Sequence, residues 1–463
     1  MNPTKVELIK KYRLASCDIT CNCNLRCKFC FNDFSQKNFN MTADIFRNVF
    51  QVVDFVPKAD DVHGTGFYFS CLWEPSISPY FLELLQLISK EDGEKVFFTS
   101  NFAKKFKEEE IEQLAKTNID HINISIETLE IDKYKVLTGG TDFNYEIFFS
   151  NLEMIHNVFS KYPDAPKIRY ISMALKSNYK ELGEIVEKCH NEYHAYMNEI
   201  RTPFSGGYIE KFRHELLNKE EISYLENLFT QSDKKISYCL EEIVLPDEVQ
   251  EAVSCDEQIA AEPDKKKKAD SLPVLSLRSL PEWHYDIRIE SNGNVSWNAN
   301  GDKFAYDENA DYHKLFADGL EKITKADAEH YVLDREVIGA YKKLSLLPLK
   351  KSFFNVDDFL EDEHFISLRG WAGVKGVDSK GQQKILELTE VGNAKNAAYY
   401  LCEDENRSDV AEIMNEPFEM AGFRVLIDKE SLVAKSLQAK MYFYDKEKNR
   451  ITYTTKDTIE LNL

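Results

Sequence analysis

The chain has 463 residues, of which 43% are hydrophobic, so it is long enough for about two or three domains with sizeable cores. Its formal net charge is -21 at pH 7, which works against binding nucleic acid or anionic lipid through bulk electrostatics. Neutral, cationic or small buried substrates fit this charge better.

The N-terminal residues MNPTKVELIKKYRLAS lack the apolar stretch that a signal peptide needs. No run of residues in the sequence approaches the length of a membrane-spanning helix. The sequence therefore predicts a cytoplasmic protein with no membrane span and no nucleic-acid partner. In a reducing compartment, clustered cysteines are more often metal ligands or catalytic groups than disulfides.

Strand-like and helix-like segments alternate in the first half of the chain, with a repeat of roughly thirty residues. The predicted strands lie at 13–20, 66–72, 95–101, 121–127, 168–174 and 197–204. Between them, residues 78–90 are expected to form a helix that Ser78 caps and that has Pro79 at its first position. Strands alternating with helices imply a parallel sheet, which right-handed crossovers curl into a partial barrel. The chemistry of such a barrel belongs at the C-terminal ends of its strands.

At the end of the first predicted strand and beyond it, residues 17–30 read CDITCNCNLRCKFC, and we call them the cysteine loop. Cys23, Cys27 and Cys30 have a Cys-x-x-x-Cys-x-x-Cys spacing, which in a tight loop can point three thiolates at one cuboidal iron-sulfur cluster. Three ligands leave one iron of a four-iron cluster open, and an open metal position is where a substrate or cofactor binds. The alternative is a structural zinc site with Cys17 or Cys21 as its fourth ligand.

The segment DITCNCNLRCKFC resembles the cluster loop of the radical SAM superfamily, which runs threonine, two variable residues and then CNLRCxxC. The matching residues are Thr20, Cys23, Asn24, Leu25, Arg26, Cys27, Phe29 and Cys30. Cys21 falls on a variable position and Cys17 lies inside the predicted strand, so neither is expected to be a ligand.

This resemblance implies that Cys23, Cys27 and Cys30 bind a [4Fe-4S] cluster, and that the cluster binds S-adenosylmethionine through its amino and carboxylate groups. It implies further that the cluster passes one electron to this cofactor, so that a 5′-deoxyadenosyl radical abstracts a hydrogen atom from the substrate. An electron donor such as flavodoxin or ferredoxin would then be a partner.

The segment FSCLWEP at 69–75 resembles the GGEP segment of the same family, whose backbone carbonyls receive the methionine ammonium. Glu74 and Pro75 are kept, and the resemblance implies that they bind the cofactor. Cys71 and Trp73 stand where small glycines are usual, so the backbone approach to the cofactor is expected to differ there.

Two further strand ends resemble cofactor-binding segments. FFTSNF at 97–102 is similar to the family's Thr-Asn-Gly stretch, which implies that Ser100 and Asn101 lie near the ribose or methionine; a surface turn is the alternative. Ser125 and Glu127 alternate with apolar residues, so a strand aims both side chains at the same face. The resemblance implies that both line the cofactor pocket.

The last two predicted strands also end in polar residues. Arg201 and Thr202 at the sixth strand can clamp a carboxylate or phosphate of the cofactor or of the substrate. Arg169 on the fifth strand can equally be a solvated strand end. Asn178 is placed to cap the helix that follows.

Residues 216–355 are expected to form a small α+β extension, with an exposed insertion near 241–275 that contains the polar run EPDKKKKADSLP. An Asn-Gly turn between two β segments at 283–304 predicts a hairpin, and this region resembles a SPASM or Twitch extension. Asn298 stands near the position of the usual auxiliary-cluster cysteine, and Cys239 and Cys255 are too few for a conventional auxiliary site.

A Twitch-like scaffold without a second cluster favours redox-neutral chemistry, such as epimerisation, dehydration or rearrangement. In such a reaction a protein thiol can return a hydrogen atom to the substrate. Cys71, Cys239 and Cys255 are the candidate donors in the sequence.

The last hundred residues consist of short alternating segments with turns between them, which is typical of a small β-sandwich. Segments 365–378 and 384–427 resemble a β module appended to bacterial glycosyltransferases that build surface polysaccharide. A stabilising or dimerising domain is the alternative.

The expected fold is therefore α/β, with a partial (β/α)6 TIM-like barrel at 1–215, the Twitch-like extension at 216–355 and a β-sandwich at 356–463. The expected activity is that of a radical SAM enzyme acting on a small-molecule, sugar or glycan-linked substrate, with modification of a ribosomally made peptide as the alternative. Two other readings remain open, namely a zinc-binding interaction protein and a degenerate barrel that only binds or assembles. No catalytic residue is assigned.

Overall fold

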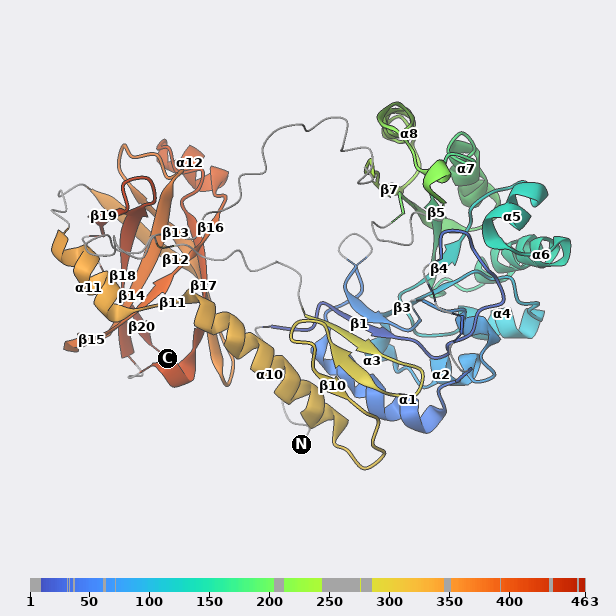
Figure 1. The fold of residues 1–463 in the computed structure, drawn as a ribbon, viewed down its shortest axis with the longest axis horizontal. Helices are drawn as coiled ribbons and strands as arrows, with labels where there is room; N and C mark the ends of the chain where they lie inside the picture. Colours follow the sequence, from blue (N-terminus) through green and yellow to red (C-terminus); the bar gives the residue numbers. More distant parts are fainter. Residues whose placement is uncertain are drawn as a thin grey trace, which may run out of the picture. The chain divides into compact units, whose positions relative to one another are not determined.

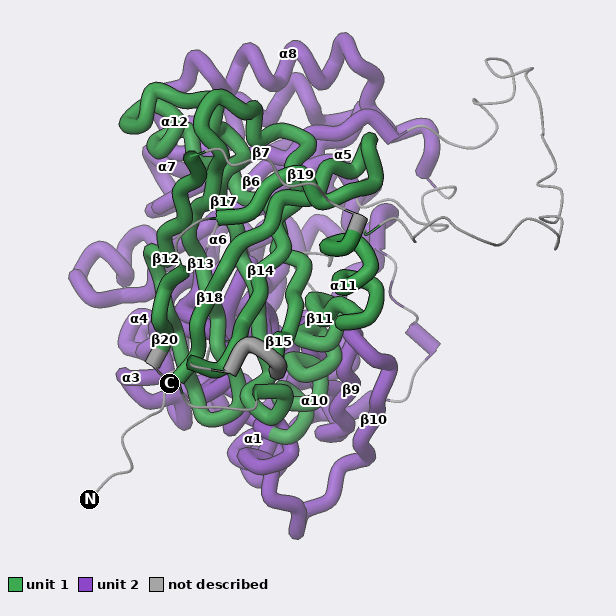
Figure 2. Tube along the Cα trace, turned by 90° about the vertical axis from the view of Figure 1, so that its left-hand side faces the viewer, with its two compact units in different colours: residues 1–11, 259–282, 318–463 green, residues 12–258, 283–317 purple. Residues whose placement is uncertain are grey.

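The computed structural model of the chain describes residues 10–30, 32, 34–35, 38–60, 64–70, 72–203, 212–243, 275, 285–344, 351–391, 393–432, 436–455 and 458–462. The chain divides into two compact units, which Figure 2 shows in different colours. We call residues 12–258 and 283–317 the sheet unit, and residues 1–11, 259–282 and 318–463 the sandwich unit. The domain boundaries expected after residues 215 and 355 stay predictions.

The sheet unit is built on seven parallel strands that follow one another across the sheet in chain order (Figure 1). They are β1 (Leu14–Cys17), β2 (Gly66–Tyr68), β3 (Val96–Ser100), β4 (His121–Ser125), β5 (Lys167–Met173), β6 (Ala195–Arg201) and β7 (Ile236–Cys239). Each of the six predicted strand segments overlaps one of the first six. The sequence did not predict β7, because its four residues are half-buried or exposed and show no apolar alternation.

Helices connect the strands of this sheet, as the partial-barrel prediction requires. They are α1 (Ala43–Val49), η1 (Phe50–Phe55), η2 (Pro75–Ile77), α2 (Phe81–Gln86), α3 (Lys90–Gly93), α4 (Glu108–Ala115), α5 (Ile131–Thr138), α6 (Asp142–Phe159), α7 (Leu182–Glu192) and α8 (Lys219–Thr230). Within the described ranges, no helix of the chain is both long enough and apolar enough to cross a membrane.

The predicted start of the helix at 78–90 was wrong. Helix α2 begins at Phe81, and Ser78 instead follows the short helix η2. Another helix, η2, begins before this position. The Glu74 carboxylate caps η2 by accepting a hydrogen bond from the Ser76 N–H at 3.0 Å. The Ser78 hydroxyl accepts only from the Tyr80 N–H, at 3.3 Å.

The predicted hairpin extends the sheet beyond its first strand. It consists of β8 (Asp286–Ile289) and β9 (Val295–Trp297), followed by β10 (Lys303–Phe304). β8 pairs in parallel with β1 and antiparallel with β9, and Gly293 supplies the φ of +87° that the turn between them requires. β10 and β7 are the edges of the resulting ten-stranded sheet, so the described strands form an open sheet rather than a closed barrel.

The sandwich unit contains two antiparallel sheets, which confirms the predicted β-sandwich. One sheet has the order β11-β15-β14-β18-β19 with β20 beside β18, and the other has the order β12-β13-β17-β16. Its elements, beginning with the part of α10 from residue 318 on, are α10 (Tyr312–Tyr331), β11 (Val332–Leu333), α11 (Arg335–Leu344), β12 (Ser352–Glu361), β13 (Phe365–Val374), β14 (Gln382–Glu390), β15 (Asn393–Leu401), β16 (Glu403–Glu405), α12 (Ser408–Met414), β17 (Gly422–Asp428), η4 (Lys429–Ser431), β18 (Ser436–Asp445), β19 (Arg450–Thr454) and β20 (Ile459–Asn462). Buried side chains from both sheets, such as Leu386 and Leu368, share one apolar core.

Candidate functional site

A cavity of about 190 Å³ lies at the C-terminal ends of β3, β4 and β5, where Ser100, Ser125 and Met173 line it. This volume is roughly ten times what one ordered water needs, so the cavity can hold a group of many atoms. Eight of the ten predicted site residues line it, namely Cys23, Cys27, Cys30, Glu74, Ser100, Asn101, Ser125 and Glu127. Pro75 and Arg201 are not among the lining residues.

The end of helix α5 holds the cysteine loop in place. The Arg26 N–H donates to the Thr138 carbonyl at 2.8 Å, and the Lys28 N–H donates to the Leu137 carbonyl at 2.9 Å. The last carbonyls of a helix have no partner within it, so these bonds satisfy them. Gly139 ends the helix at a φ of +67°, and a Cβ there would lie 2.9 Å from the Arg26 carbonyl oxygen. Only glycine therefore lets the loop approach so closely.

The three thiols of the cysteine motif lie in the wall of this cavity and interact with one another. Burial is the main cause that raises the pKa of Cys23 to about 11, and the charges of Glu74 and Cys30 contribute to this rise. Burial also raises the pKa of Cys27, with additional repulsion from Glu127 and from the other two thiols. Because thiolates that repel one another are stabilised by a bound cation, this donor set fits a positively charged metal centre.

The other two cysteines of the loop do not line the cavity. Cys17 is buried inside β1, and the Cys21 sulfur accepts a hydrogen bond from the Phe39 N–H at 3.0 Å. In the part of the chain that the structure describes, no three His, Cys, Asp or Glu side chains form a set that could hold one metal ion. A [4Fe-4S] cluster differs from a single ion because each cysteine binds a different iron. A zinc site would also need a fourth ligand, and neither Cys17 nor Cys21 supplies it at this cavity.

Glu74 joins the segments that follow β2 and β3. One carboxylate oxygen accepts from the Ser100 hydroxyl at 2.7 Å and from the Ser76 N–H at 3.0 Å, and the other accepts from the Asn101 N–H at 2.6 Å. The Glu74 residue is only 2% exposed, and its burial raises its pKa. The Ser100 hydroxyl in turn accepts from the Phe102 N–H at 3.0 Å. Glu74 and Ser100 therefore shape the cavity wall by holding two strand ends together.

Glu127 lies in the cavity wall just beyond β4, and its carboxylate accepts from the Met173 N–H at 2.9 Å. Burial raises its pKa to about 8, against the lowering effects of the Met173 hydrogen bond and the Arg201 charge. The folded protein therefore keeps a proton on Glu127 between about pH 4.5 and pH 8, where the unfolded chain releases it. The free energy of unfolding falls over this pH range, and this loss persists above it.

We expect Glu127→Gln to remove this pH-dependent fall in the free energy of unfolding. Glutamine keeps the acceptor for the Met173 N–H and carries no charge. The gain in unfolding free energy over the wild type should be near zero at about pH 4.5 and reach a few kcal/mol, at about 1.4 kcal/mol per unit of pKa shift, above about pH 8. Denaturant unfolding of the metal-free proteins at both pH values measures it. Glu153→Gln, on the exposed face of α6, is the control. A gain that did not change with pH would contradict the raised pKa of Glu127.

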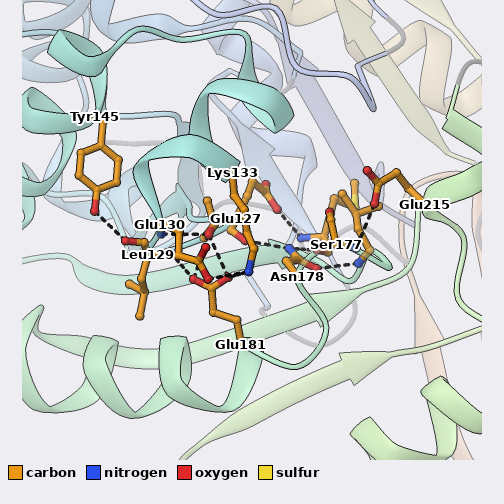
Figure 3. A network of polar contacts seen from close by, with 12 residues as sticks. Glu127, Leu129, Glu130, Lys133, Tyr145, Ser177, Asn178, Glu181 and Glu215 are labelled. Carbon is orange, nitrogen blue, oxygen red and sulfur yellow. Dashed lines mark hydrogen bonds and ion pairs between the residues drawn. The ribbon is translucent and has the colours of Figure 1, made fainter.

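Asn178 connects the ends of β4 and β5, as the close-up in Figure 3 shows. Its amide nitrogen donates to the main-chain carbonyls of Glu127 at 2.8 Å and Met173 at 2.9 Å, and the Asn178 residue is 1% exposed. The prediction that Asn178 caps the following helix was wrong, because α7 begins only at Leu182. Asn178 is instead part of the framework behind the cavity wall.

Glu181 completes this framework. Its carboxylate accepts hydrogen bonds from the Thr128 hydroxyl at 2.9 Å and from the Leu129 N–H at 2.6 Å, and it forms an ion pair with Lys133 at 3.2 Å (Figure 3). The segment between β4 and α5 is thus fastened at both ends. These contacts join residues about fifty positions apart, so no local pattern in the sequence predicts them.

Arg201 and Arg169 share one carboxylate on the sheet. Arg201 lies 3.3 Å from Glu199, and Arg169 on the neighbouring strand forms an ion pair with the same residue. Arg169 is only 7% exposed, which excludes the solvated strand end as its environment. Cofactor binding by Arg201 stays a prediction.

Several residues named in the sequence analysis lie outside the described residues, namely Cys71, Cys255 and most of the insertion near 241–275. Cys239, at the end of the edge strand β7, is exposed and does not line the cavity. Its assignment as a hydrogen-atom donor stays a prediction.

Residues 18–189 match the family model described as the radical SAM superfamily. The chain is 26% identical over 174 residues to a GTP 3′,8-cyclase of Actinobacillus pleuropneumoniae serotype 3 (strain JL03), covering 34% of this chain and 48% of that protein. It is 24% identical over 174 residues to the tungsten-containing aldehyde ferredoxin oxidoreductase cofactor-modifying protein of Pyrococcus furiosus, covering 36% and 45%. The chain thus spans about half the length of the curated relatives it matches.

Among solved structures, Streptococcus suis SuiB bound to S-adenosylmethionine aligns at 18% identity with a TM-score of 0.43, covering 67% of each chain. The segment matched by the family model begins right after β1, contains residues 18–30 of the cysteine loop and extends into α7. It also contains every residue that the structure places in the cavity wall. Residues 18–189 therefore match the radical SAM superfamily, whose enzymes use a [4Fe-4S] cluster and S-adenosylmethionine.

Proposed function

We propose that this chain is a radical SAM enzyme in which Cys23, Cys27 and Cys30 hold the [4Fe-4S] cluster and the adjoining cavity takes S-adenosylmethionine. The observation that carries the proposal is that these three thiols line one cavity at the C-terminal strand ends. When bound, the cluster and S-adenosylmethionine supply a 5′-deoxyadenosyl radical that abstracts a hydrogen atom from the substrate.

The residues around the thiols suit this chemistry. Leu25, Phe29, Trp73 and Phe148 make part of the wall apolar, which excludes water from a reactive radical. Both carboxylate oxygens of Glu74 already accept hydrogen bonds from the protein, so we assign Glu74 to positioning the cavity wall. Ser125 and Glu127 remain as polar side chains that we propose to bind the cofactor. Pro75, Ser100, Asn101 and Arg201 complete the proposed set of cofactor-site residues.

The reaction class that we propose is redox-neutral, such as epimerisation, dehydration or rearrangement. The described cysteines outside the cysteine loop are Cys189 on α7, Cys239 on β7 and Cys402 between β15 and β16, and they lie singly rather than as a set of cluster ligands. A net oxidation of the substrate would need an acceptor for a second electron. An electron donor such as flavodoxin or ferredoxin is the proposed protein partner, in the cytoplasm.

The proposed substrate is a sugar or a glycan-linked molecule, because segments of the sandwich unit resemble a module of glycosyltransferases that build surface polysaccharide. A peptide is the alternative. Radical formation that is coupled to a substrate rises when the correct substrate is present. Formation of 5′-deoxyadenosine that glycan intermediates stimulate, and unstructured peptides do not, is the expected outcome, and the reverse result would support the alternative.

Anaerobic reconstitution with iron and sulfide tests the proposal directly. We expect about four irons per chain, a brown absorption that fades on reduction, and release of 5′-deoxyadenosine from S-adenosylmethionine under a strong reductant. Uptake of zinc without iron would contradict the cluster and support an interaction protein. A complete cluster that never cleaves the cofactor would instead identify a degenerate barrel.

A further inference from the structure

The side chain of Asn101 contacts one of the proposed cluster ligands. Its amide nitrogen lies 3.6 Å from the Cys23 sulfur and 2.9 Å from the side-chain oxygen of Asn24. An amide nitrogen carries two hydrogens, so it can donate to both acceptors at once. Sulfur is large and accepts at longer distances than oxygen does, so 3.6 Å is a hydrogen-bonding distance here.

Ala103 determines which way both amides point. Its main-chain N–H donates to the Asn101 side-chain oxygen at 2.9 Å, and its carbonyl accepts from the Asn24 side-chain nitrogen at 3.2 Å. A main-chain N–H needs an acceptor, so the oxygen of Asn101 must face Ala103 and its nitrogen must face Cys23. The Ala103 carbonyl can only accept, so the nitrogen of Asn24 faces it and the oxygen of Asn24 faces Asn101. The three residues close a ring of hydrogen bonds, with one hydrogen of Asn101 left over for the sulfur.

The turn that creates this ring contains a residue with an unusual backbone conformation. Phe102, between Asn101 and Ala103, has a φ of +52°, which is rare for a large side chain. The Ser100 hydroxyl accepts from the Phe102 N–H, and the Asn151 amide donates to the Phe102 carbonyl at 2.8 Å. Phe102 itself is completely buried. Backbone strain that several contacts maintain in this way is typical of positions where the geometry of a site matters.

We propose that Asn101 is a positioning residue that donates an N–H···S hydrogen bond to the Cys23 thiolate of the bound cluster and thereby raises the cluster's reduction potential. The inference rests on the proposed function, and it gives Asn101 a role different from contact with the ribose or methionine. Reduction adds negative charge to the cluster and its sulfurs. A donor at a sulfur therefore stabilises the reduced state more than the oxidised state.

Two variants of Asn101 separate the hydrogen bond from the turn. In Asn101→Ser the short neutral hydroxyl still accepts from the Ala103 N–H but does not reach the sulfur. In Asn101→Asp the acceptor and the shape are kept, the donor is lost and a negative charge is added. Asn157→Asp, on the exposed face of α6, adds the same charge at a position that does not line the cavity and is the control.

The measurement is the midpoint potential of the reconstituted cluster without S-adenosylmethionine, followed by electron paramagnetic resonance in a redox titration. At the wild-type midpoint, the ratio of reduced to oxidised cluster should fall about threefold in Asn101→Ser. It should fall about tenfold in Asn101→Asp, which is 59 mV for a one-electron couple. The potential of Asn157→Asp should equal that of the wild type.

The iron content of each protein makes the outcomes distinguishable. An unchanged potential in Asn101→Ser with a complete cluster would overturn the inference and leave the proposed function standing, even if Asn101→Asp shifted, because charge alone would then explain that shift. If Asn101→Ser takes up no iron, Asn101→Thr, which also has a short neutral hydroxyl, takes its place, and an unchanged potential in that variant overturns the inference. A wild-type protein that binds no cluster would overturn the proposed function, and this inference with it.

Discussion

Replacement of Cys27 by alanine is expected to abolish iron loading, whereas Cys17→Ala should still take up about four irons per chain. The Cys27 thiol lies in the cavity wall, where it interacts with the thiols of Cys23 and Cys30. The cluster would have three protein ligands, and no other described cysteine lines this cavity to replace a missing one. Iron and sulfide content after anaerobic reconstitution, with the absorption spectrum, measures the difference.

Cys17 is the matched control because it belongs to the same loop and is more deeply buried. Its side chain packs inside β1, so its truncation should lower the unfolding free energy by about 1 kcal/mol without changing the ligand set. Equal loss of iron in both variants would show that the ligand assignment is wrong. Equal retention would show that Cys27 is not a ligand.

Glu74→Ala is expected to lower the unfolding free energy of the metal-free protein by about 3 kcal/mol or more. The change leaves three donors without their acceptor, namely the buried Ser76 N–H and Ser100 hydroxyl and the partly buried Asn101 N–H. Each unsatisfied buried donor costs about 1–3 kcal/mol, and removal of a buried carboxylate offsets part of this. Affinity for S-adenosylmethionine should fall as well, because the wall formed by Ser100 and Asn101 loses its anchor.

Glu74→Gln separates the two opposing effects. Glutamine keeps one oxygen acceptor and removes the charge, but its NH₂ group faces a donor where the second oxygen was. We expect an unfolding free energy between those of Glu74→Ala and the wild type, measured by denaturant unfolding. Glu83→Ala, exposed on α2, should change it by less than about 0.5 kcal/mol. A Glu74→Gln protein more stable than the wild type would show that the cost of burying the carboxylate exceeds the value of its hydrogen bonds.

Much of the fold and of the candidate site could be predicted because the signals are local. The spacing of Cys23, Cys27 and Cys30 lies within eight residues, and segments of five to seven residues rich in apolar side chains mark the central strands. Once these strands are parallel, their C-terminal ends must meet at one edge. The Asn-Gly turn at Gly293 is local in the same sense, and its hairpin was predicted correctly.

The wrong predictions concern polar residues that had more than one possible hydrogen-bond partner. Ser78 and Asn178 both have the chemistry of a helix cap and stand near a helix start. The sequence offers no way to see that Glu74 caps an earlier helix, or that the main chain beyond β4 and β5 needs the Asn178 amide. β7 was missed because a short edge strand buries too little to leave an apolar pattern.

By itself the sequence determined the motif, the order of strands and helices and the edge of the sheet where the candidate site lies, since each depends on residues close together along the chain. Only the tertiary structure decided what the individual polar side chains do. Glu74 reaches residues 26 and 27 positions away, and Asn101 reaches Cys23 across 78 positions. A hydrogen bond depends on tenths of an ångström and on the direction of its donor, and packing sets both only after distant segments have come together.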